Sequence, residues 1–372
     1  MKHKNMCKLI GSIISFIILF GTQSCSDMSE LSDRFLDEGS IIYAAKVDSV
    51  SAHPGDGRIE MEIFVKTQRI DYVRIYWNDR ADHKDVVINN QPGTYNVSIE
   101  MDESSYVFNL ISVDKYGNES LPVEVSSEVF GDNFRQTISN RLVAKASYDV
   151  VSKSLILKWG GITNFGVANE IKYTNISGKE VTKRIDFEEV ITQLTDWASG
   201  LKYRTLSLPD PLAVDTFYTS YDQLSKVSLD KSTWTMLSFS SEVNGSSENR
   251  AQNAINDIYT DRWHSAGNGY PGWMIIDFGG EVDIKAFGVT PSVYDIGNKD
   301  VDVRFPTTVR FEVSLDNVNW ISLGDFTSIN TRPGEQIFNV DATKARYYRF
   351  TGVKSDAGVG YMVIGELDAY LY

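Results

Sequence analysis

The sequence predicts an all-β protein, and two observations lead to this prediction. Short runs in which Val, Ile, Tyr and Phe alternate with polar residues recur along most of the chain. Clusters of Gly, Asn, Asp and Pro separate these runs, as turns separate strands, and long helical patterns are scarce. The 372 residues are enough for two or three domains, so we expect a series of β-sandwiches.

The first residues predict export and a lipid anchor. Three lysines precede an apolar run over residues 9–20, which is too short to span a bilayer comfortably, and "TQSC" follows with Cys25 at its end. We therefore predict a lipoprotein signal peptide over residues 1–24 and acylation of Cys25; the alternative is an ordinary secretory signal. The chain has one other cysteine, and it lies inside this signal, so the mature chain cannot form an internal disulfide.

Charge and composition limit the classes of partner that the protein can bind. Cleavage of the signal removes three lysines and no acidic residue, which moves the net charge from −14 to −17. Such a surface repels phosphate backbones, so we predict no nucleic-acid partner. Residues 25–38 are polar and acidic and are interpreted as a tether. Acidic residues directly behind a lipidated cysteine resemble the surface-export signal of some Gram-negative lipoproteins, which implies an outer-membrane protein facing the cell exterior.

Two sandwich domains are expected over residues 39–134 and 135–228. The runs "RIEMEIFV" and "VRIYWND" have weaker copies in "KSLILKWGG" and "NEIKYTN" about 95 residues later, a spacing close to one immunoglobulin-like domain. Together with "SYVFNLISVDKYGNES" and "VDTFYT", these runs resemble the two-repeat N-terminal region of exported lipoproteins from glycan-degrading bacteria. That region has no assigned chemistry. The resemblance implies two immunoglobulin- or fibronectin III-like sandwiches in front of a ligand-binding module.

Residues 229–372 carry a second resemblance, in five pieces that occur in the same order as in the family. The pieces are "NAINDIYTDRWHS", "PGWMIIDFGGEVDIKAFGV", "TTVRFEVSLDNVNW", "ARYYRFTG" and "IGELDAY". They resemble the F5/8 type C family, also called discoidin-like or galactose-binding-like. The resemblance implies an eight-stranded jelly-roll sandwich whose ligand loops lie at one end.

The same resemblance implies a carbohydrate site. Relatives that bind galactose-type sugars place a histidine directly after the loop tryptophan, and His264 holds that position here. Tyr361 matches the aromatic that stacks on the sugar. Two positions depart from the pattern, because Gly267 stands where a second aromatic is expected and Ser292 where an arginine is expected. Allowing for replacements from neighbouring positions, the candidate ligand-binding residues are His264, Tyr270, Tyr294, Asn298, Arg304 and Tyr361.

A calcium site is the next candidate. The family's loop usually holds a structural ion with carboxylate and carbonyl oxygens, the ligands that calcium prefers. The corresponding stretch here is "AINDIYTDRW", in which Ile258 removes one oxygen. The resemblance implies Asn256, Asp261 and Glu366 as side-chain ligands of a possible structural calcium. The alternative is a hydrogen-bonded loop without metal.

No enzymatic activity is expected. The sequence has no nucleophile elbow, His-Glu-x-x-His, P-loop or Cys-x-x-Cys motif. The predicted function is non-catalytic glycan capture at the cell surface, and the resemblance implies an outer-membrane importer and secreted glycosidases as partners. The alternative is a protein-interaction or assembly subunit of an outer-membrane complex without sugar binding.

Overall fold

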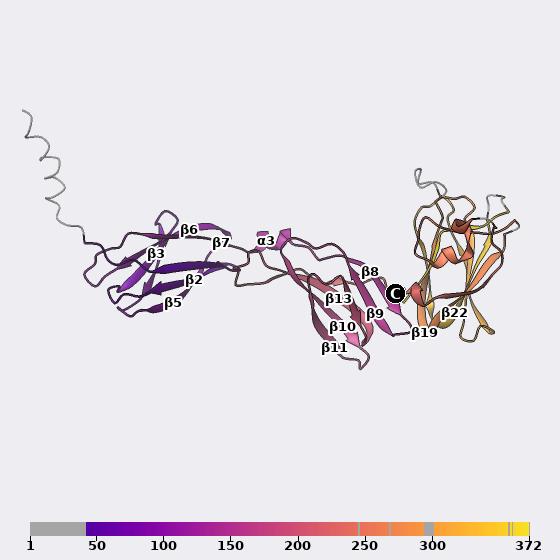
Figure 1. Ribbon diagram of the computed structural model, residues 1–372, viewed down its shortest axis with the longest axis horizontal. Helices are drawn as coiled ribbons and strands as arrows, with labels where there is room; N and C mark the ends of the chain where they lie inside the picture. The colour runs from indigo at the N-terminus through magenta and orange to yellow at the C-terminus, as the bar shows by residue number, and fades with distance from the viewer. Residues whose placement is uncertain are drawn as a thin grey trace, which may run out of the picture. The chain divides into compact units, whose positions relative to one another are not determined.

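The computed structural model confirms the all-β prediction, since strands dominate every part that it describes (Figure 1). The signal and tether predictions, with Cys25, lie outside the described residues. No helix among the residues described is both long enough and apolar enough to span a membrane. The structure describes residues 42–244, 246–267, 269–293, 301–355, 358 and 360–371.

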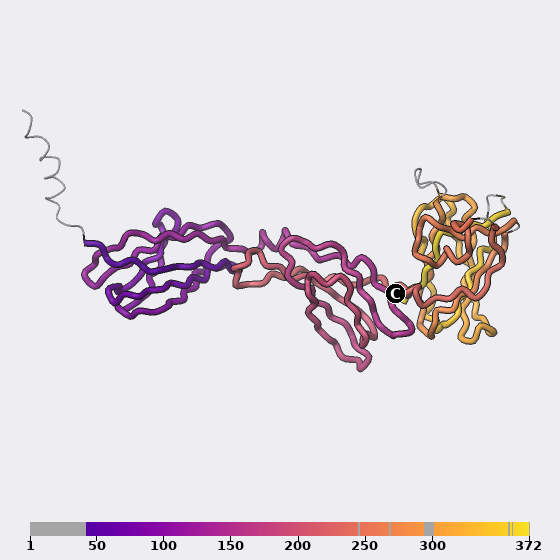
Figure 2. Tube along the Cα trace, viewed as in Figure 1, coloured from indigo at the N-terminus to yellow at the C-terminus, as the bar shows by residue number. Residues whose placement is uncertain are grey.

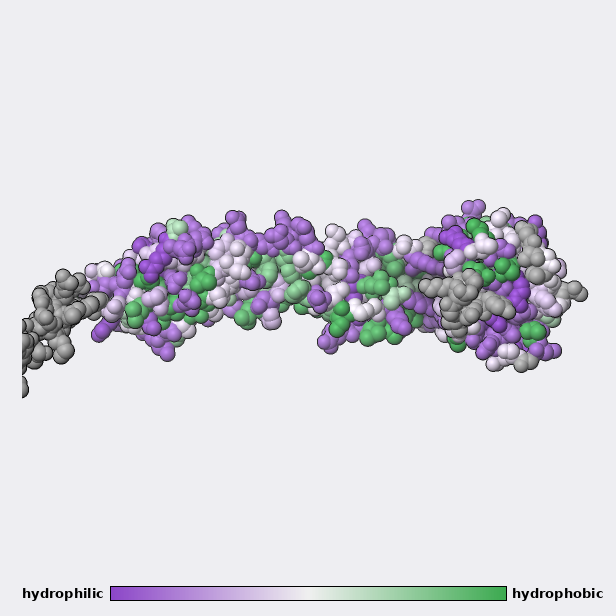
Figure 3. Space-filling model, turned by 90° about the horizontal axis from the view of Figure 1, so that it is seen from above, coloured by the Kyte–Doolittle hydropathy of each residue, from purple (hydrophilic) through white to green (hydrophobic). Residues whose placement is uncertain are grey.

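The chain divides into two compact units. The first comprises Met1–Gly131 with Leu212–Val214, and the second comprises Asp132–Pro211 with Asp215–Tyr372. On the face drawn in Figure 3, apolar residues lie in small groups between hydrophilic ones.

The first unit is a β-sandwich. One sheet has the order β1-β2-β5 and the other the order β4-β3-β6-β7. Along β2, Ile59, Met61 and Ile63 are buried while the residues between them are not, which is the period of two that the sequence predicts. The strands are β1 (Ser49–Pro54), β2 (Arg58–Val65), β3 (Tyr72–Trp77), β4 (Asp82–Val87), β5 (Gly93–Glu100), β6 (Ser104–Val113) and β7 (Val123–Val129).

The second unit begins with a sandwich that repeats this topology. Its sheets have the orders β12-β9-β8 and β11-β10-β13-β14, so the first, second and fifth strands again face the other four. The identical order confirms the predicted immunoglobulin- or fibronectin III-like repeat. The elements are α3 (Asp132–Thr137), β8 (Val143–Asp149), β9 (Ser154–Trp159), β10 (Gly166–Asn175), β11 (Glu180–Asp186), β12 (Ile191–Leu194), β13 (Trp197–Ser207), β14 (Phe217–Tyr218) and β15 (Asp222–Gln223).

A jelly roll follows. Strands β17 to β24 supply the eight strands expected, as counted over the described residues, and the long strands β19 and β22 pair along most of their length with shifts of register that let them bend. The elements are β16 (Ser228–Leu229), η1 (Lys231–Thr233), β17 (Thr235–Phe239), η2 (Ser247–Asn249), η3 (Ala251–Ile255), β18 (Trp263–His264), β19 (Gly272–Thr290), β20 (Thr308–Ser314), β21 (Trp320–Thr327), β22 (Gln336–Lys354), β23 (Val363–Ile364) and β24 (Glu366–Tyr370).

Strand β16 joins the second sandwich to the jelly roll. Ser228 pairs with Ser147 of β8 in parallel and with Tyr370 of β24 in antiparallel orientation. The sheet therefore continues from β12 through β8 and β16 into β24 and β19, and the C-terminal end of the trace lies beside this junction (Figure 2). The domain boundary that the sequence suggested between residues 228 and 229 falls inside β16.

The jelly-roll core is built around aromatic rings. Phe287 stacks on Phe311 at 4.9 Å and on Tyr348 at 4.5 Å between ring centroids, and all three side chains are fully buried. Trp263 is also fully buried. Offset aromatic pairs of this kind add to the free energy gained from burial, so this core fixes the strands that carry the ligand loops.

Candidate functional site

The short strand β18 fixes the position of His264. It pairs with β23, so that Trp263 lies opposite Ile364 and His264 opposite Val363. Successive side chains of a strand point to opposite faces, and Trp263 enters the core, where its indole Nε1 donates to the carbonyl of Ser241 at 2.9 Å. The His264 side chain is consequently directed away from the core and is half-buried.

Both ring nitrogens of His264 have partners. Nδ1 lies 2.8 Å from the carbonyl oxygen of Ser265, and Nε2 lies 2.8 Å from Nη1 of Arg304. A guanidinium only donates, so Nε2 accepts and the proton lies on Nδ1, which donates to the carbonyl. Burial, with the Arg304 charge adding to it, lowers the pKa of His264 although the Ser265 carbonyl opposes the shift. The neutral imidazole is therefore favoured.

Arg304 is held by a carboxylate that the sequence did not single out. Its Nε and Nη2 donate to the two oxygens of Asp302 at 2.7 and 2.5 Å. The Asp302 side chain is 2% exposed, whereas that of Arg304 is 21% exposed. Such a bidentate pair fixes the plane of the guanidinium. The only sequence signal for it is the spacing of Asp and Arg in "DVRF", which also occurs in ordinary surface pairs.

Tyr361 is the exposed aromatic of this group. It is 45% exposed, and its ring centroid lies 5.4 Å from that of His264 with the planes tilted by 59°. A Cβ added to Gly267 would lie 3.8 Å from Tyr361 Cε1, so Gly267 borders the ring without covering it. A larger side chain at position 267 would start in van der Waals contact with this ring.

The other predicted ligand residues divide into two groups. The hydroxyl of Tyr270 donates to the backbone carbonyl of Arg304 at 2.6 Å, and its ring packs on the core. Tyr270 therefore holds the backbone of Arg304 in place and does not present its hydroxyl to a ligand. Its burial raises the pKa of the phenol well above the usual range. Tyr294 and Asn298 lie outside the described residues. Ser292, which stands where the family has arginine, is buried, and Arg304 brings a guanidinium to His264 instead.

The arrangement is suited to binding rather than to proton transfer. His264 bonds a carbonyl on one side and a cation on the other, so it does not face a reacting group as a general base must. The exposed ring of Tyr361 offers an apolar face, and Arg304 and His264 form a polar edge beside it. These groups together define the His264–Arg304–Tyr361 surface.

The predicted calcium loop is bonded internally. Asn256 Oδ1 accepts from the backbone N–H of Ile258 at 2.8 Å, and Asn256 Nδ2 lies 3.3 Å from Asp261 Oδ2. Within the described ranges, no group of three or more His, Cys, Asp or Glu is arranged to hold a metal ion. In the structure the side-chain oxygens of Asn256 and Asp261 are thus engaged within the loop.

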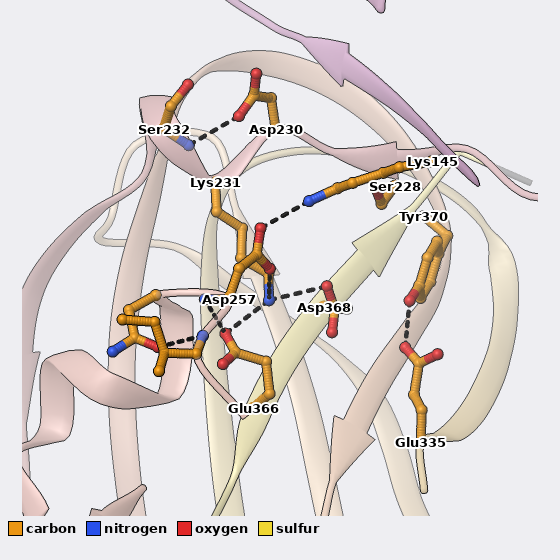
Figure 4. A network of polar contacts seen from close by, with 12 residues as sticks. Lys145, Ser228, Asp230, Lys231, Ser232, Asp257, Glu335, Glu366, Asp368 and Tyr370 are labelled. Carbon is orange, nitrogen blue, oxygen red and sulfur yellow. Dashed lines mark hydrogen bonds and ion pairs between the residues drawn. The ribbon is translucent and has the colours of Figure 1, made fainter. Parts of the chain in front are cut away.

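The third predicted calcium ligand, Glu366, bonds a lysine. Its Oε1 lies 2.7 Å from the ammonium Nζ of Lys231, which also lies 2.9 Å from Asp368 and 3.0 Å from Asp257 (Figure 4). We call these three carboxylates with Lys231 the Lys231 cage. A positive charge already occupies the centre of these oxygens, so the donor set does not fit a calcium ion.

Burial shifts the pKa values of the charged groups in the cage. It raises the pKa of Glu366 to about 7 and raises that of Asp368, although Lys231 opposes both shifts. For Lys231 itself burial alone would lower the pKa, but the charges of Asp368 and Glu366 outweigh it and the pKa is raised. One ammonium is shared among three carboxylates, which keeps the lysine charged and leaves the deepest carboxylate incompletely compensated.

Comparison with known families matches two parts of the chain separately. A family described as a domain of unknown function, DUF4998, matches residues 25–217, and the F5/8 type C domain matches residues 236–367. No curated protein matches the chain.

Several solved structures are similar to part of this chain. CpGH89CBM32-5 of Clostridium perfringens, in complex with GalNAc-beta-1,3-galactose, is 19% identical with a TM-score of 0.34, over 38% of this chain and 99% of that chain. The C-terminal domain of a chitobiase from Bacteroides fragilis is 28% identical with a TM-score of 0.33, over 39% of this chain and 99% of that chain. The family 32 module of C. perfringens NanJ, in complex with galactose, is 19% identical with a TM-score of 0.32, over 39% and 98%.

The predicted resemblance over residues 229–372 is confirmed by the F5/8 type C match. The DUF4998 match spans more than half of the 372 residues and covers the first sandwich and the second up to the start of β14. This chain therefore belongs to the DUF4998 family and carries an F5/8 type C domain behind the family's own region.

Proposed function

We propose that this protein is a non-catalytic surface lipoprotein that captures carbohydrate through its F5/8 type C domain. One observation carries the proposal: the exposed ring of Tyr361 lies beside His264, whose orientation Arg304 fixes. The arrangement comes from segments far apart in the sequence, β18, the stretch before β20 and the stretch before β23, within a domain of the F5/8 type C family.

The chemistry of this surface suits a pyranose. A sugar with an axial hydroxyl has one apolar face that stacks on an aromatic ring, and its hydroxyl groups take in-plane hydrogen bonds at the rim of the ring. Tyr361 supplies the ring, and Arg304, which Asp302 and His264 hold in place, supplies the polar rim. Affinity for one sugar unit is expected to be weak, because sugar hydroxyls exchange bonds with water for bonds with protein at small net gain. Galactose-type sugars are the first class to test.

A glycan array with the chain produced from residue 26 onward tests the proposal. We expect binding to one class of glycan and loss of that binding in His264→Ala. Tyr259→Ala is the matched control, since Tyr259 is 63% exposed in the same domain and takes no part in this surface. Absence of binding to any glycan contradicts the proposal and favours a protein partner.

The two sandwiches act as a spacer in this proposal. Their strands bury two separate cores, and no chemistry is assigned to their family. A spacer places a ligand domain away from the membrane, where it meets polysaccharide before an importer does. We therefore include an outer-membrane importer and secreted glycosidases as proposed partners, to be identified by co-purification from cells grown on the bound glycan.

The membrane anchor is proposed at Cys25. Acylation of this residue adds about 0.8 kcal/mol for each buried methylene, so several chains make a stable anchor in the outer membrane. Cys25→Ala should release the protein from membranes into the soluble fraction. Unchanged fractionation of this variant would refute the anchor, and accessibility of the intact protein to added protease in whole cells tests its exposure at the cell surface.

A further inference from the structure

Lys231 is an unusual lysine because its charge is buried. The side chain is 5% exposed, whereas Glu366 and Asp368 beside it are 0% and 11% exposed. Asp230 caps the η1 turn by accepting from the backbone of Ser232 at 2.9 Å, and this turn directs Lys231 inward (Figure 4). A buried charge is costly unless it is paired, so the position requires the carboxylates around it.

The geometry of the cage matches an ammonium. A lysine carries three N–H donors, and three carboxylate oxygens lie 2.7, 2.9 and 3.0 Å from Nζ. They come from separate places in the fold: Glu366 and Asp368 alternate along β24, and Asp257 follows η3. Lys231 therefore ties the start of the jelly roll to its last strand and to the loop in which the family keeps its calcium.

The cage also has the features of a cation site. The second oxygen of Glu366, Oε2, is buried and has no hydrogen-bond partner among the described residues. Asp257 additionally bonds Lys145 of strand β8 at 2.7 Å, and Lys145 is 44% exposed. The oxygens are thus gathered around one central positive charge, with an exposed lysine at the edge.

We propose that the ammonium of Lys231 takes the place of a structural metal ion in this F5/8 type C domain, so that the domain folds without calcium. The proposal is independent of glycan binding. It predicts that removal of the ammonium converts the cage into a site for a divalent cation. The oxygens would need to approach by only about 0.4 Å to reach the 2.3–2.6 Å typical of calcium.

Thermal unfolding of the full chain from residue 26 tests this proposal. The wild type should melt at the same temperature in excess chelator and in millimolar calcium. Lys231→Met should melt several degrees lower in chelator, and calcium should recover a large part of the loss. Lys145→Met, which removes the exposed lysine on the same carboxylate, should melt close to the wild type and should not respond to calcium.

Two results would overturn the proposal: a wild type whose melting temperature depends on calcium, and a Lys231→Met variant that melts like the wild type. If Lys231→Met does not fold, the proposal is tested on the wild type alone. Calcium titration calorimetry and metal analysis after gel filtration should then show no bound calcium, and one calcium per chain would refute the idea.

Discussion

Two cations of the jelly roll are paired with carboxylates in opposite surroundings. Arg304 is 21% exposed and has one bidentate partner, Asp302, with His264 and the exposed ring of Tyr361 beside it. Lys231 is 5% exposed and has three carboxylates around it. In the first pair a buried carboxylate, Asp302, holds a cation that reaches the surface, whereas in the second the cation itself is buried. Pairing alone therefore does not reveal a role, and exposure distinguishes the two.

Replacing each cation in turn should give its largest difference in the stability of the protein. Lys231→Met leaves buried carboxylates without their cation and should lower the free energy of unfolding by about 3–5 kcal/mol. Arg304→Met leaves one buried carboxylate, Asp302, without its cation and should cost less, about 1–3 kcal/mol. Urea unfolding followed by tryptophan fluorescence measures both values. Equal losses in the two variants would remove the distinction between the cations.

The pH dependence of stability sharpens the same contrast. Burial raises the pKa of Glu366 from its ordinary value of 4.5 to about 7, so the folded state holds the proton more tightly than the unfolded chain. The associated stability is complete below about pH 4.5 and is lost as the pH rises through 7. Relative to Glu366→Gln, the wild type should lose about 3 kcal/mol between pH 5 and pH 8.

This comparison with Glu366→Gln is needed because other groups titrate in the same window. The lowered pKa of His264 acts in the opposite direction, since the folded state disfavours its charged form. The wild type and Glu366→Gln share the contribution of His264, so it cancels when their free energies of unfolding are subtracted. If this difference in free energy does not change with pH, Glu366 stays ionised in the cage.

Substitutions in the His264–Arg304–Tyr361 surface should weaken glycan binding, whereas substitutions in the Lys231 cage should not. Tyr361→Ala should weaken glycan binding about tenfold, the loss expected when about 1.4 kcal/mol of stacking is removed. Its melting temperature should not change, because the ring is 45% exposed. Calorimetric titration with the glycan identified on the array measures the affinity, and Tyr259→Ala should bind like the wild type. Equal affinity of Tyr361→Ala and wild type would exclude the ring from the site.

The smallest effect is expected from protonation of His264. Its Nε2 must be neutral to accept from Arg304, and its pKa is lowered, so affinity should stay constant from about pH 8 to pH 7. It should fall several-fold only below about 6.5, the ordinary histidine value. His264→Gln should lack this dependence. A decline that already begins above pH 7 would contradict the neutral imidazole.

The sequence predicted most of the fold because strand and turn patterns are local. The alternation in "RIEMEIFV" and its later copy was enough to predict two similar sandwiches, and the structure confirms their common strand order. The joining strand β16 was missed, because two residues are too few to show a period.

The site was predicted in part. His264 and Tyr361 follow family positions and lie together, although 97 residues separate their segments. Tyr270 is next to them but its hydroxyl is directed at backbone. The Lys231 cage had no local signal, since Lys231 and Glu366 are 135 residues apart and a single lysine in "LDKSTW" resembles any surface lysine. Long-range ion pairs depend on tertiary contacts that no short pattern records.

Strand β24 has a consequence for how the protein is made. Its five residues are all buried between β16 and β19, and two of them belong to the Lys231 cage. The first sandwich has all its strands once Val129 has been synthesised, but β24 follows some 240 residues later, roughly 10 to 50 seconds at common rates of translation. A chain broken off before Glu366 would keep that sandwich and leave two open strand edges, which are prone to pair with other chains. Cells can therefore be expected to remove such fragments by proteolysis rather than display them.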